Sequence, residues 1–333
     1  MKVHITKIYN DASTAGMSQA KTAKIAKEMG FYEMGIYRYP VDSDNDKELG
    51  TRIDGIISAL EPNDIVFIQS PSWNGLRYDY RFISKLRGYK NVKIAIFIHD
   101  VIPLMFNSGE ENLRRTIDIY NQADLIIAPS QKMLDLLTEY GLTVKKQMIQ
   151  HMWDYPIDYK LKQPSFSKNL FFTGAPSRFP FVHSWNYDTK LNVYTYESFS
   201  TDTINVELRG RKNELGLLSD LSEGGYGLVW SSDESTKQYY EMLQPYKVAT
   251  FLSAGIPIIM QRGLTVEDTI LKNGLGFVVD NLSEADAIVQ STTEEEYNEM
   301  VKRISDFNFL INEGWFTKKM LSDAIMMLLN NNI

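Results

Sequence analysis

The chain contains no cysteine among its 333 residues. This absence excludes a disulfide scaffold, a zinc ribbon, a thiol nucleophile and iron–sulfur ligation, because all of them need cysteine. A chain of this length buries roughly three quarters of its unfolded surface, so it needs neither a disulfide nor a metal to fold. The absence of cysteine also fits a cytoplasmic protein, and we expect that location.

Histidine is scarce, and its spacing excludes the usual metal motifs. The four histidines are scattered at positions 4, 99, 151 and 183, without an i, i+4 pair. Asp42-Ser-Asp44 and Asp44-Asn-Asp46 have the D-x-D spelling that some sugar-nucleotide enzymes use for a divalent cation, but we expect this acidic run to be a solvated loop. The chain also lacks a P-loop, a G-x-S-x-G turn and the G-x-G-x-x-G dinucleotide fingerprint. We therefore predict no metal and no cofactor.

Excess positive charge and long apolar runs are missing as well. There are 42 acidic and 35 basic side chains, which give a formal net charge of -7. A nucleic-acid binder usually carries a basic patch, so we expect no nucleic-acid partner. No segment reaches the ~20 apolar residues that a membrane helix needs, and the N-terminus lacks the long apolar stretch of a signal peptide. We expect no integral membrane segment.

The first half of the chain alternates short β-branched runs with longer amphipathic stretches. This alternation predicts βαβ units and a parallel, doubly wound sheet. The two most apolar runs, 65–68 and 94–98, are typical of strands covered on both faces. The expected strands cover 3–8, 31–37, 64–69, 92–98, 124–128 and 147–150, and the expected helices cover 18–29, 48–60, 80–86, 110–122 and 131–140.

The same alternation resumes after an irregular segment with two prolines and several aromatic residues, 151–168. We predict two Rossmann-like domains, residues 1–150 and 169–314, joined by this segment as a linker, and a last helical segment at 315–333. The expected strands of the second domain cover 169–173, 193–196, 205–208, 227–230, 257–260 and 276–279. The fold class is α/β, with the two domains expected to face each other across a cleft. Ligands of such sheets bind at the carboxyl ends of the strands.

Two loops of the first domain follow strands and carry polar residues. Thr14 and Gly16 lie in the loop after the first strand, where backbone N–H groups before a helix favour a ligand oxygen. An ordinary βα turn explains this loop equally well. His99 and Asp100 directly follow the apolar strand that ends at Ile98, which favours acid–base chemistry or hydroxyl binding. A capping role for Asp100 is the alternative.

The corresponding loops of the second domain are cationic. Gly174 and Arg178 follow its first strand, and an arginine at this position offers a forked donor for phosphate. Lys247 lies in the first turn of an expected helix that begins after Pro245, where the helix dipole attracts anions. Arg211 ends a further loop of this kind. We expect Arg178 and Lys247 to be exposed, with a bound phosphate as their partner.

These residues resemble a known fold family. The stretch Gln122–Ser130, QADLIIAPS, resembles the strand and helix turn of glycosyltransferases with the GT-B fold. The stretch Lys247–Ile259 is similar to their donor-site helix and strand, and the order of elements is similar over the whole chain. The resemblance implies a GT-B fold whose C-terminal helix crosses back onto the first domain.

The chain resembles one group more closely, namely the streptococcal cytoplasmic glucosyltransferases that extend O-linked N-acetylglucosamine on serine-rich repeat adhesins. This closer resemblance rests on His99-Asp100 followed by a proline, Thr173-Gly174 with Arg178, and Pro245-Tyr246-Lys247. It implies transfer of glucose from UDP-glucose to N-acetylglucosamine on a serine-rich protein, by an enzyme that we expect to be a homo-oligomer. The alternative is a GT-B transferase that acts on a cell-wall or capsular polysaccharide intermediate.

The resemblance also implies roles for individual residues. Arg178 and Lys247 would contact the diphosphate with Tyr246 nearby, and the loop with Thr14 and Gly16 would face the same diphosphate from the first domain. Such enzymes are generally independent of metals. One departure is that Met242 and Thr250 stand where many retaining members carry the E-x7-E glutamates. The choice between inversion and retention therefore stays open, and Asp100 is the candidate base for its position alone.

Two alternative functions, from other classes of protein, fit the residues less well than an enzyme does. A two-domain sugar-binding protein of the exported type would need an export signal, which the N-terminus lacks. A non-catalytic partner of another transferase would not need the cationic loops of the second domain. An enzyme is therefore the favoured interpretation.

Overall fold

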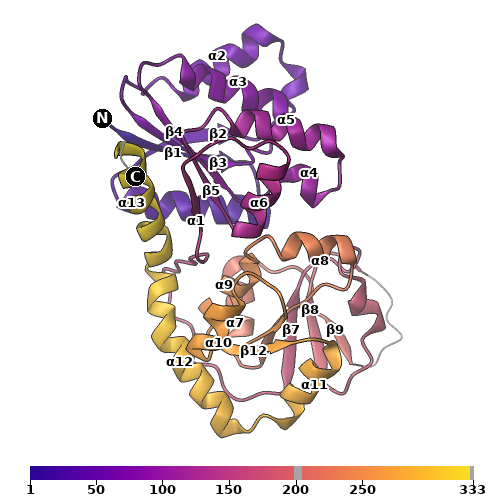
Figure 1. Cartoon of the computed structure of the whole chain (residues 1–333). Helices are drawn as coiled ribbons and strands as arrows, with labels where there is room; N and C mark the ends of the chain where they lie inside the picture. Colours follow the sequence, from indigo (N-terminus) through magenta and orange to yellow (C-terminus); the bar gives the residue numbers. More distant parts are fainter. Residues whose placement is uncertain (199–204, 331–333) are drawn as a thin grey trace. The chain divides into compact units, whose positions relative to one another are not determined.

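The computed structural model describes residues 1–198 and 205–330. The chain divides into two compact units, which are described separately: unit 1 is Met1–His151 with the segment from Phe316, and unit 2 is Met152–Trp315. The return of the last helix to unit 1 agrees with the predicted fold (Figure 1).

Unit 1 is built on a parallel six-stranded sheet in the order β2-β1-β3-β4-β5-β6. Figure 1 shows α2 and α3 on one side of this sheet and α1 on the other. The strands are β1 (Val3–Tyr9), β2 (Tyr32–Tyr37), β3 (Ile65–Ser70), β4 (Lys93–Ile98), β5 (Leu125–Ala128) and β6 (Gln147–Ile149). The helices are α1 (Thr14–Glu28), η1 (Val41–Ser43), α2 (Asp46–Ile56), α3 (Leu76–Arg87), α4 (Ile102–Met105), α5 (Glu110–Tyr120), α6 (Gln131–Glu139) and α13 (Trp315–Leu329).

The central strands of unit 1 are nearly continuous in apolar residues because both of their faces are covered. All six residues of β4 except Lys93 are buried, and all four residues of β5 are buried. The pairing of β3 with β4 puts Ser70 opposite Ile98, so that the residues that follow these two strands lie side by side.

Unit 2 repeats this architecture with the strand order β12-β11-β10-β7-β8-β9, again all parallel. Its strands are β7 (Asn169–Thr173), β8 (Lys190–Tyr194), β9 (Val206–Leu208), β10 (Tyr226–Val229), β11 (Ile258–Gln261) and β12 (Gly276–Val279). Its helices are η2 (Pro180–Ser184), α7 (Glu214–Leu221), α8 (Glu234–Tyr240), α9 (Tyr246–Ser253), α10 (Glu267–Asn273), α11 (Leu282–Ser291) and α12 (Glu294–Asn312). The prediction of a two-sheet α/β fold is confirmed.

The irregular segment 152–168 contains no helix or strand, as its prolines indicate, yet it packs within unit 2. Trp153 donates its indole N–H to the carbonyl oxygen of Gln244 at 2.8 Å, and the backbone N–H of Tyr155 donates to Ile311 at 3.1 Å. Both aromatic side chains are buried. Burial of these rings fixes the segment against α9 and α12.

The acidic run at 42–48 is exposed apart from Asp44, but it is not a loop throughout, since η1 covers Val41–Ser43 and α2 begins at Asp46. Asp44 is buried and accepts hydrogen bonds from the Arg52 guanidinium and the Tyr39 hydroxyl, at 2.6 and 2.7 Å. Asn45 caps α2 in a reciprocal capping box with Glu48, so this helix begins before the expected position 48. Capping and ion pairing therefore give these polar residues a structural role.

Candidate functional site

The predicted cations of unit 2 meet at the carboxyl end of β7. Gly174 and Arg178 lie in the turn after β7, and Lys247 lies in the first turn of α9. The Lys247 ammonium is placed over three rings, at 3.9 Å from the centroid of Phe179, 4.5 Å from Phe172 and 5.5 Å from Tyr240. We call Arg178 and Lys247 the cationic cluster.

Arg178 shares two of these rings. Its guanidinium carbon lies 5.7 Å from the centroid of Phe179 and 5.9 Å from that of Tyr240. Cations are attracted to the faces of aromatic rings, and this attraction holds the two side chains together despite their like charge. Within residues 1–198 and 205–330, neither Arg178 nor Lys247 forms an ion pair with a carboxylate. The cluster is therefore a site of uncompensated positive charge.

Neither Arg178 nor Lys247 is the exposed side chain that we expected, because both are partly buried. Burial, followed by the charge of Arg178, lowers the pKa of the Lys247 ammonium well below its usual value. It donates a long hydrogen bond of 3.4 Å to the Tyr240 hydroxyl. A dianion in contact with this ammonium would raise the pKa again, because an opposite charge favours the charged form.

Gly174 makes room for the rings around the cluster. A Cβ atom at this position would lie 2.9 Å from ring atoms of both Phe172 and Phe179, which is closer than carbon atoms pack. The glycine thus lets these two rings meet edge to face, with centroids 5.1 Å apart. A side chain here would displace the ring that supports Lys247.

The helix α9 begins without a side-chain cap, since its N-cap residue is Pro245. The first N–H groups of a helix have no intrahelical acceptor, so this end of α9 favours an anion. Tyr246 is the next residue along the helix, but its ring packs against Trp153 and Tyr155, at centroid distances of 5.7 and 5.4 Å. Its role in binding the donor stays a prediction, while its packing role is evident.

Arg211 lies in the loop after a different strand from Arg178. It is exposed and follows β9, the edge strand of the sheet, whereas Arg178 follows β7 with β8 between them. Adjacent strands lie about 4.8 Å apart, so the two loops start roughly 10 Å from each other. Contact of Arg211 with the same ligand stays a prediction.

In unit 1, Thr14 is the first residue of α1, and Ser13 caps this helix. The Ser13 hydroxyl accepts from the backbone N–H of Gly16 at 3.3 Å, so one N–H group that we expected to face a ligand is used inside the cap. A Cβ atom at Gly16 would lie 2.4 Å from the carbonyl oxygen of Asp11, which explains the glycine by close packing. Ligand contacts at Thr14 and Gly16 stay predictions.

His99 lies directly after β4 and is buried, with 5% of its surface exposed. Its Nδ1 lies 3.1 Å from the Ser18 hydroxyl, which also donates to the Ala15 carbonyl at 2.9 Å. Burial lowers the pKa of His99 to about 3, so the imidazole is neutral at pH 7. This geometry suits a positioning hydrogen bond between β4 and α1 better than proton abstraction.

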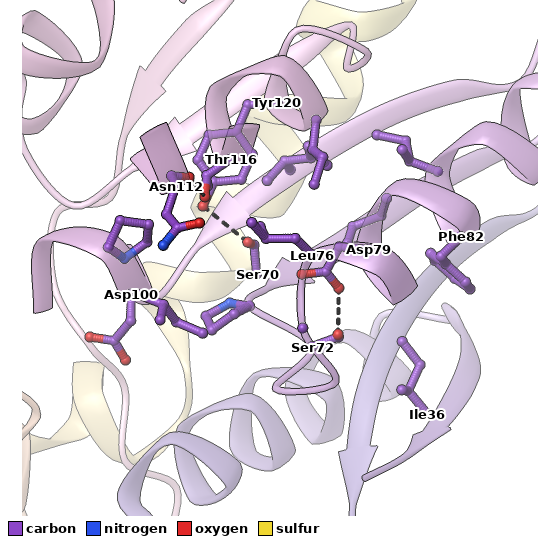
Figure 2. A pocket seen from close by; sticks show the side chains of 18 of the residues that line it. Ile36, Ser70, Ser72, Leu76, Asp79, Phe82, Asp100, Asn112, Thr116 and Tyr120 are labelled. Atoms are coloured by element: carbon purple, nitrogen blue, oxygen red, sulfur yellow. Dashed lines mark hydrogen bonds between the residues drawn. The ribbon is translucent and has the colours of Figure 1, made fainter. Parts of the chain in front are cut away.

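Asp100 lines a pocket of about 240 Å³ in unit 1, which Figure 2 shows from close by. Its backbone N–H lies 3.4 Å from the Ser70 carbonyl oxygen at the end of the neighbouring strand β3. The carboxylate of Asp100 is thus at the carboxyl edge of the sheet, as predicted, and its role as the base stays a prediction. The pocket itself was not foreseen, because its polar residues come from three separate segments.

The residues that the sequence analysis missed are mainly aromatic. Phe172 and Phe179 flank the turn with Gly174 and Arg178, and this flanking pattern is visible in the sequence. Tyr240 ends α8, an element that the apolar pattern did not predict. In the pocket, Asp79 was missed because it resembles an ordinary acidic residue in the first turn of a helix.

Across residues 1–198 and 205–330, no group of three or more histidine, aspartate or glutamate residues is placed to hold a metal ion. In the same residues, no helix combines the length and the apolar character needed to cross a membrane.

The fold defines the class of protein. A structure of Anabaena HepE solved with UDP-glucose superposes with a TM-score of 0.68 at 9% identity, covering 98% of this chain and 100% of that chain. At this identity the likeness concerns the fold, which is the GT-B fold of glycosyltransferases.

The sequence comparisons identify the family. Residues 2–152 match the family model "Glucosyltransferase 3-like, N-terminal domain", and residues 170–324 match "Glucosyltransferase 3-like, C-terminal domain". Glucosyltransferase 3 of Streptococcus gordonii is 44% identical over 335 residues, covering 99% of this chain and 100% of the relative. Glucosyltransferase 3 of Streptococcus parasanguinis is 39% identical over 98% of both chains. The chain belongs to the glucosyltransferase 3-like family and is a glycosyltransferase.

Proposed function

We propose that the protein transfers glucose from UDP-glucose to N-acetylglucosamine that is already linked to a serine-rich repeat adhesin. Membership of the glucosyltransferase 3-like family supports glucose as the transferred sugar. A structure of the same fold that was solved with UDP-glucose supports the nucleotide donor. The adhesin acceptor rests on the sequence resemblance described above.

The observation that carries the donor assignment is the cationic cluster. Two adjacent cations that lack a carboxylate partner in the described part of the chain repel each other, and burial disfavours the charge on Lys247. A ligand with two negative charges compensates both effects, and the uncapped start of α9 supplies further N–H donors. A nucleoside diphosphate provides this charge.

The same residues fit the chemistry of the transfer. Negative charge grows on the diphosphate as the bond between the sugar and the phosphate oxygen breaks. The Arg178 guanidinium offers parallel N–H donors and Lys247 a point charge, and such groups stabilise the leaving diphosphate in a dry site. We propose that these groups replace a metal ion. Asp100 is the proposed base for the acceptor hydroxyl.

A panel of nucleotide sugars tests the donor. We expect release of UDP from UDP-glucose in preference to the release of nucleotide from GDP- or CMP-sugars. Titration of UDP by calorimetry is the matching binding measurement. An absence of UDP binding at millimolar concentrations would overturn the donor assignment.

A second panel tests the acceptor. A serine-rich peptide is offered with and without O-linked N-acetylglucosamine, beside a cell-wall polysaccharide intermediate. We expect glucose to be added only to the glycosylated peptide. Addition to the polysaccharide intermediate alone would favour the alternative acceptor class. The cytoplasmic location and the homo-oligomeric state stay predictions.

A further inference from the structure

The pocket of unit 1 is enclosed between the sheet and the helices α3 and α5. Residues that follow β3 and β4 line it, which places it at the edge where parallel sheets bind ligands. Its deep walls are aliphatic and aromatic, contributed by Ile36, Ile68, Phe82, Ile83, Ile96 and Ile119. At about 240 Å³ it lies just below the volumes of drug-sized sites, so it fits one sugar ring with a substituent.

Its polar side chains come from three segments of the chain and are Ser70, Ser72, Asp79, Asp100, Ser108, Asn112, Thr116 and Tyr120. Figure 2 shows Asp79 and Asp100 on either side of Ser70. The Ser70 hydroxyl is 3.1 Å from the Tyr120 hydroxyl, and the Ser72 hydroxyl donates to one carboxylate oxygen of Asp79. These hydrogen bonds fix the orientation of the groups that a ligand would meet.

Asp79 is the group that sets the chemistry of the pocket. It lies in the first turn of α3, where a helix dipole favours a carboxylate. Burial outweighs the hydrogen bonds from the Ser72 hydroxyl and the Ser72 backbone N–H, and it raises the pKa of Asp79 to about 6. At pH 7 the pocket therefore holds a poorly solvated carboxylate that gains from a further hydrogen-bond donor.

This composition selects among ligands. A phosphate or carboxylate would be repelled by Asp79, which excludes a nucleotide and an anionic lipid head group. The apolar walls favour a methyl or methylene group, and Asp79 favours an N–H or O–H donor. An acetamido group combines a methyl group with an N–H donor in one small, uncharged unit.

We propose that this pocket binds the acetamido group of the acceptor sugar, with Asp79 accepting its N–H and the isoleucine walls contacting its methyl group. This inference rests on the proposed acceptor and makes Asp79 the residue that distinguishes N-acetylglucosamine from glucose. A site built to accept an N–H rejects an analogue that lacks it, because its buried acceptor is then left unpaired.

The test compares two glycopeptides that differ only in the acetamido group, one with O-linked N-acetylglucosamine and one with O-linked glucose. In Asp79→Leu we expect the KM for the first peptide to rise about tenfold to a hundredfold, the loss expected for a hydrogen bond to a charged group. The KM for UDP-glucose and the low activity on the second peptide stay unchanged. Asp42→Leu, which removes an exposed carboxylate elsewhere in unit 1, is the control.

A second readout is independent of transfer. Saturation-transfer NMR on the methyl protons of N-acetylglucosamine should detect contact with the wild-type protein and with Asp42→Leu, but not with Asp79→Leu. Asp79→Ala, which removes both carboxylate oxygens and leaves no side-chain acceptor, replaces Asp79→Leu in both assays if the latter unfolds.

The outcomes separate the two proposals. Methyl saturation without any transfer to the glycosylated peptide would reject the proposed acceptor and keep the pocket assignment. Unchanged acceptor KM in both Asp79 variants, or equal methyl saturation in the wild type and in both Asp79 variants, would overturn the pocket assignment. Methyl saturation absent from the wild type would overturn it as well.

Discussion

At the scale of single residues, Lys247 shows how a partly buried cation is held among aromatic rings. Three rings surround its ammonium, and their attraction offsets part of the cost of taking a charge out of water. The attraction offsets only part of this cost, since the pKa of the Lys247 ammonium is still lowered. The charge on Lys247 is thus held at the expense of stability, and contact with the proposed diphosphate would offset this cost.

The matched substitution for this residue is Lys247→Met, which keeps the apolar stem and removes the charge. We expect the free energy of unfolding to stay equal or to rise by about 1 kcal/mol, because a buried unpaired charge is lost. UDP affinity should fall by about tenfold to a hundredfold. Urea denaturation and calorimetry check the two effects. The control is Lys272→Met, at an exposed lysine of α10, which should change neither the free energy of unfolding nor the UDP affinity. A wild-type UDP affinity in Lys247→Met would contradict the proposed role of Lys247 in donor binding.

Asp79 should give unit 1 a pH-dependent stability. Its folded pKa of about 6 lies above the ordinary value of 3.8, so the folded state holds this proton more tightly than the unfolded state. The stabilising contribution is complete at low pH and is lost as the pH rises from about 4 through 6. The shift bounds the effect at about 3 kcal/mol, and the partial exposure of Asp79 to solvent reduces it to about 1–2 kcal/mol.

Asp79→Asn should therefore be more stable than the wild type at pH 7.5, and this advantage should shrink as the pH falls to 4.5. Urea denaturation at both values measures the difference. An advantage of the same size at both pH values would show that the carboxyl group has an ordinary pKa.

At the scale of elements, the C-terminal end of α13 is held by Lys146, a residue far from this helix in the sequence. The Lys146 ammonium donates to the carbonyl oxygens of Met327 and Asn330, at 2.7 and 3.1 Å. These carbonyls belong to the last turn of the helix and its end, which have no intrahelical donor. A cation at this end also complements the helix dipole.

Lys146→Met should lower the free energy of unfolding by about 0.5–1.5 kcal/mol through loss of these bonds. Amide exchange in the last turn of α13 should become faster than in its middle. Lys145→Met, one residue earlier and exposed, is the control. Equal exchange in both variants would show that packing alone holds the helix.

At the scale of the whole molecule, the donor should stabilise mainly unit 2. At a UDP concentration of a hundred times its Kd, the free energy of unfolding rises by about 2.7 kcal/mol. We expect the added amide protection to centre on residues 172–179 and 240–250, which form the cationic cluster and its surroundings. Added amide protection confined to unit 1 would show that UDP binds to unit 1 and not to the cationic cluster.

Transfer should also survive chelation, because the proposed charge stabilisation comes from side chains and the start of α9. Turnover measured in excess EDTA is expected to equal turnover in buffer alone. Loss of turnover in EDTA that manganese or magnesium restores would show that a metal ion takes part.

The sequence by itself determined the fold class. Short β-branched runs that alternate with amphipathic stretches specify parallel strands with helical crossovers, because this local periodicity decides which faces can be buried. It also located the loops with Asp100, Gly174 and Arg178, since loops after parallel strands gather at one edge of the sheet. The start of α2 was misplaced because the capping residue Asn45 lies within a run of charges.

Only the tertiary structure decided the environments of the charged groups. The rings around Lys247 come from β7, the turn after it and α8, so no single stretch of sequence shows them together. Asp79 and Asp44 are similar acidic residues near helix starts, yet one lines an apolar pocket and the other pairs with Arg52. The physical reason is that desolvation and pairing depend on neighbours from distant segments, whereas secondary structure depends on neighbours along the chain.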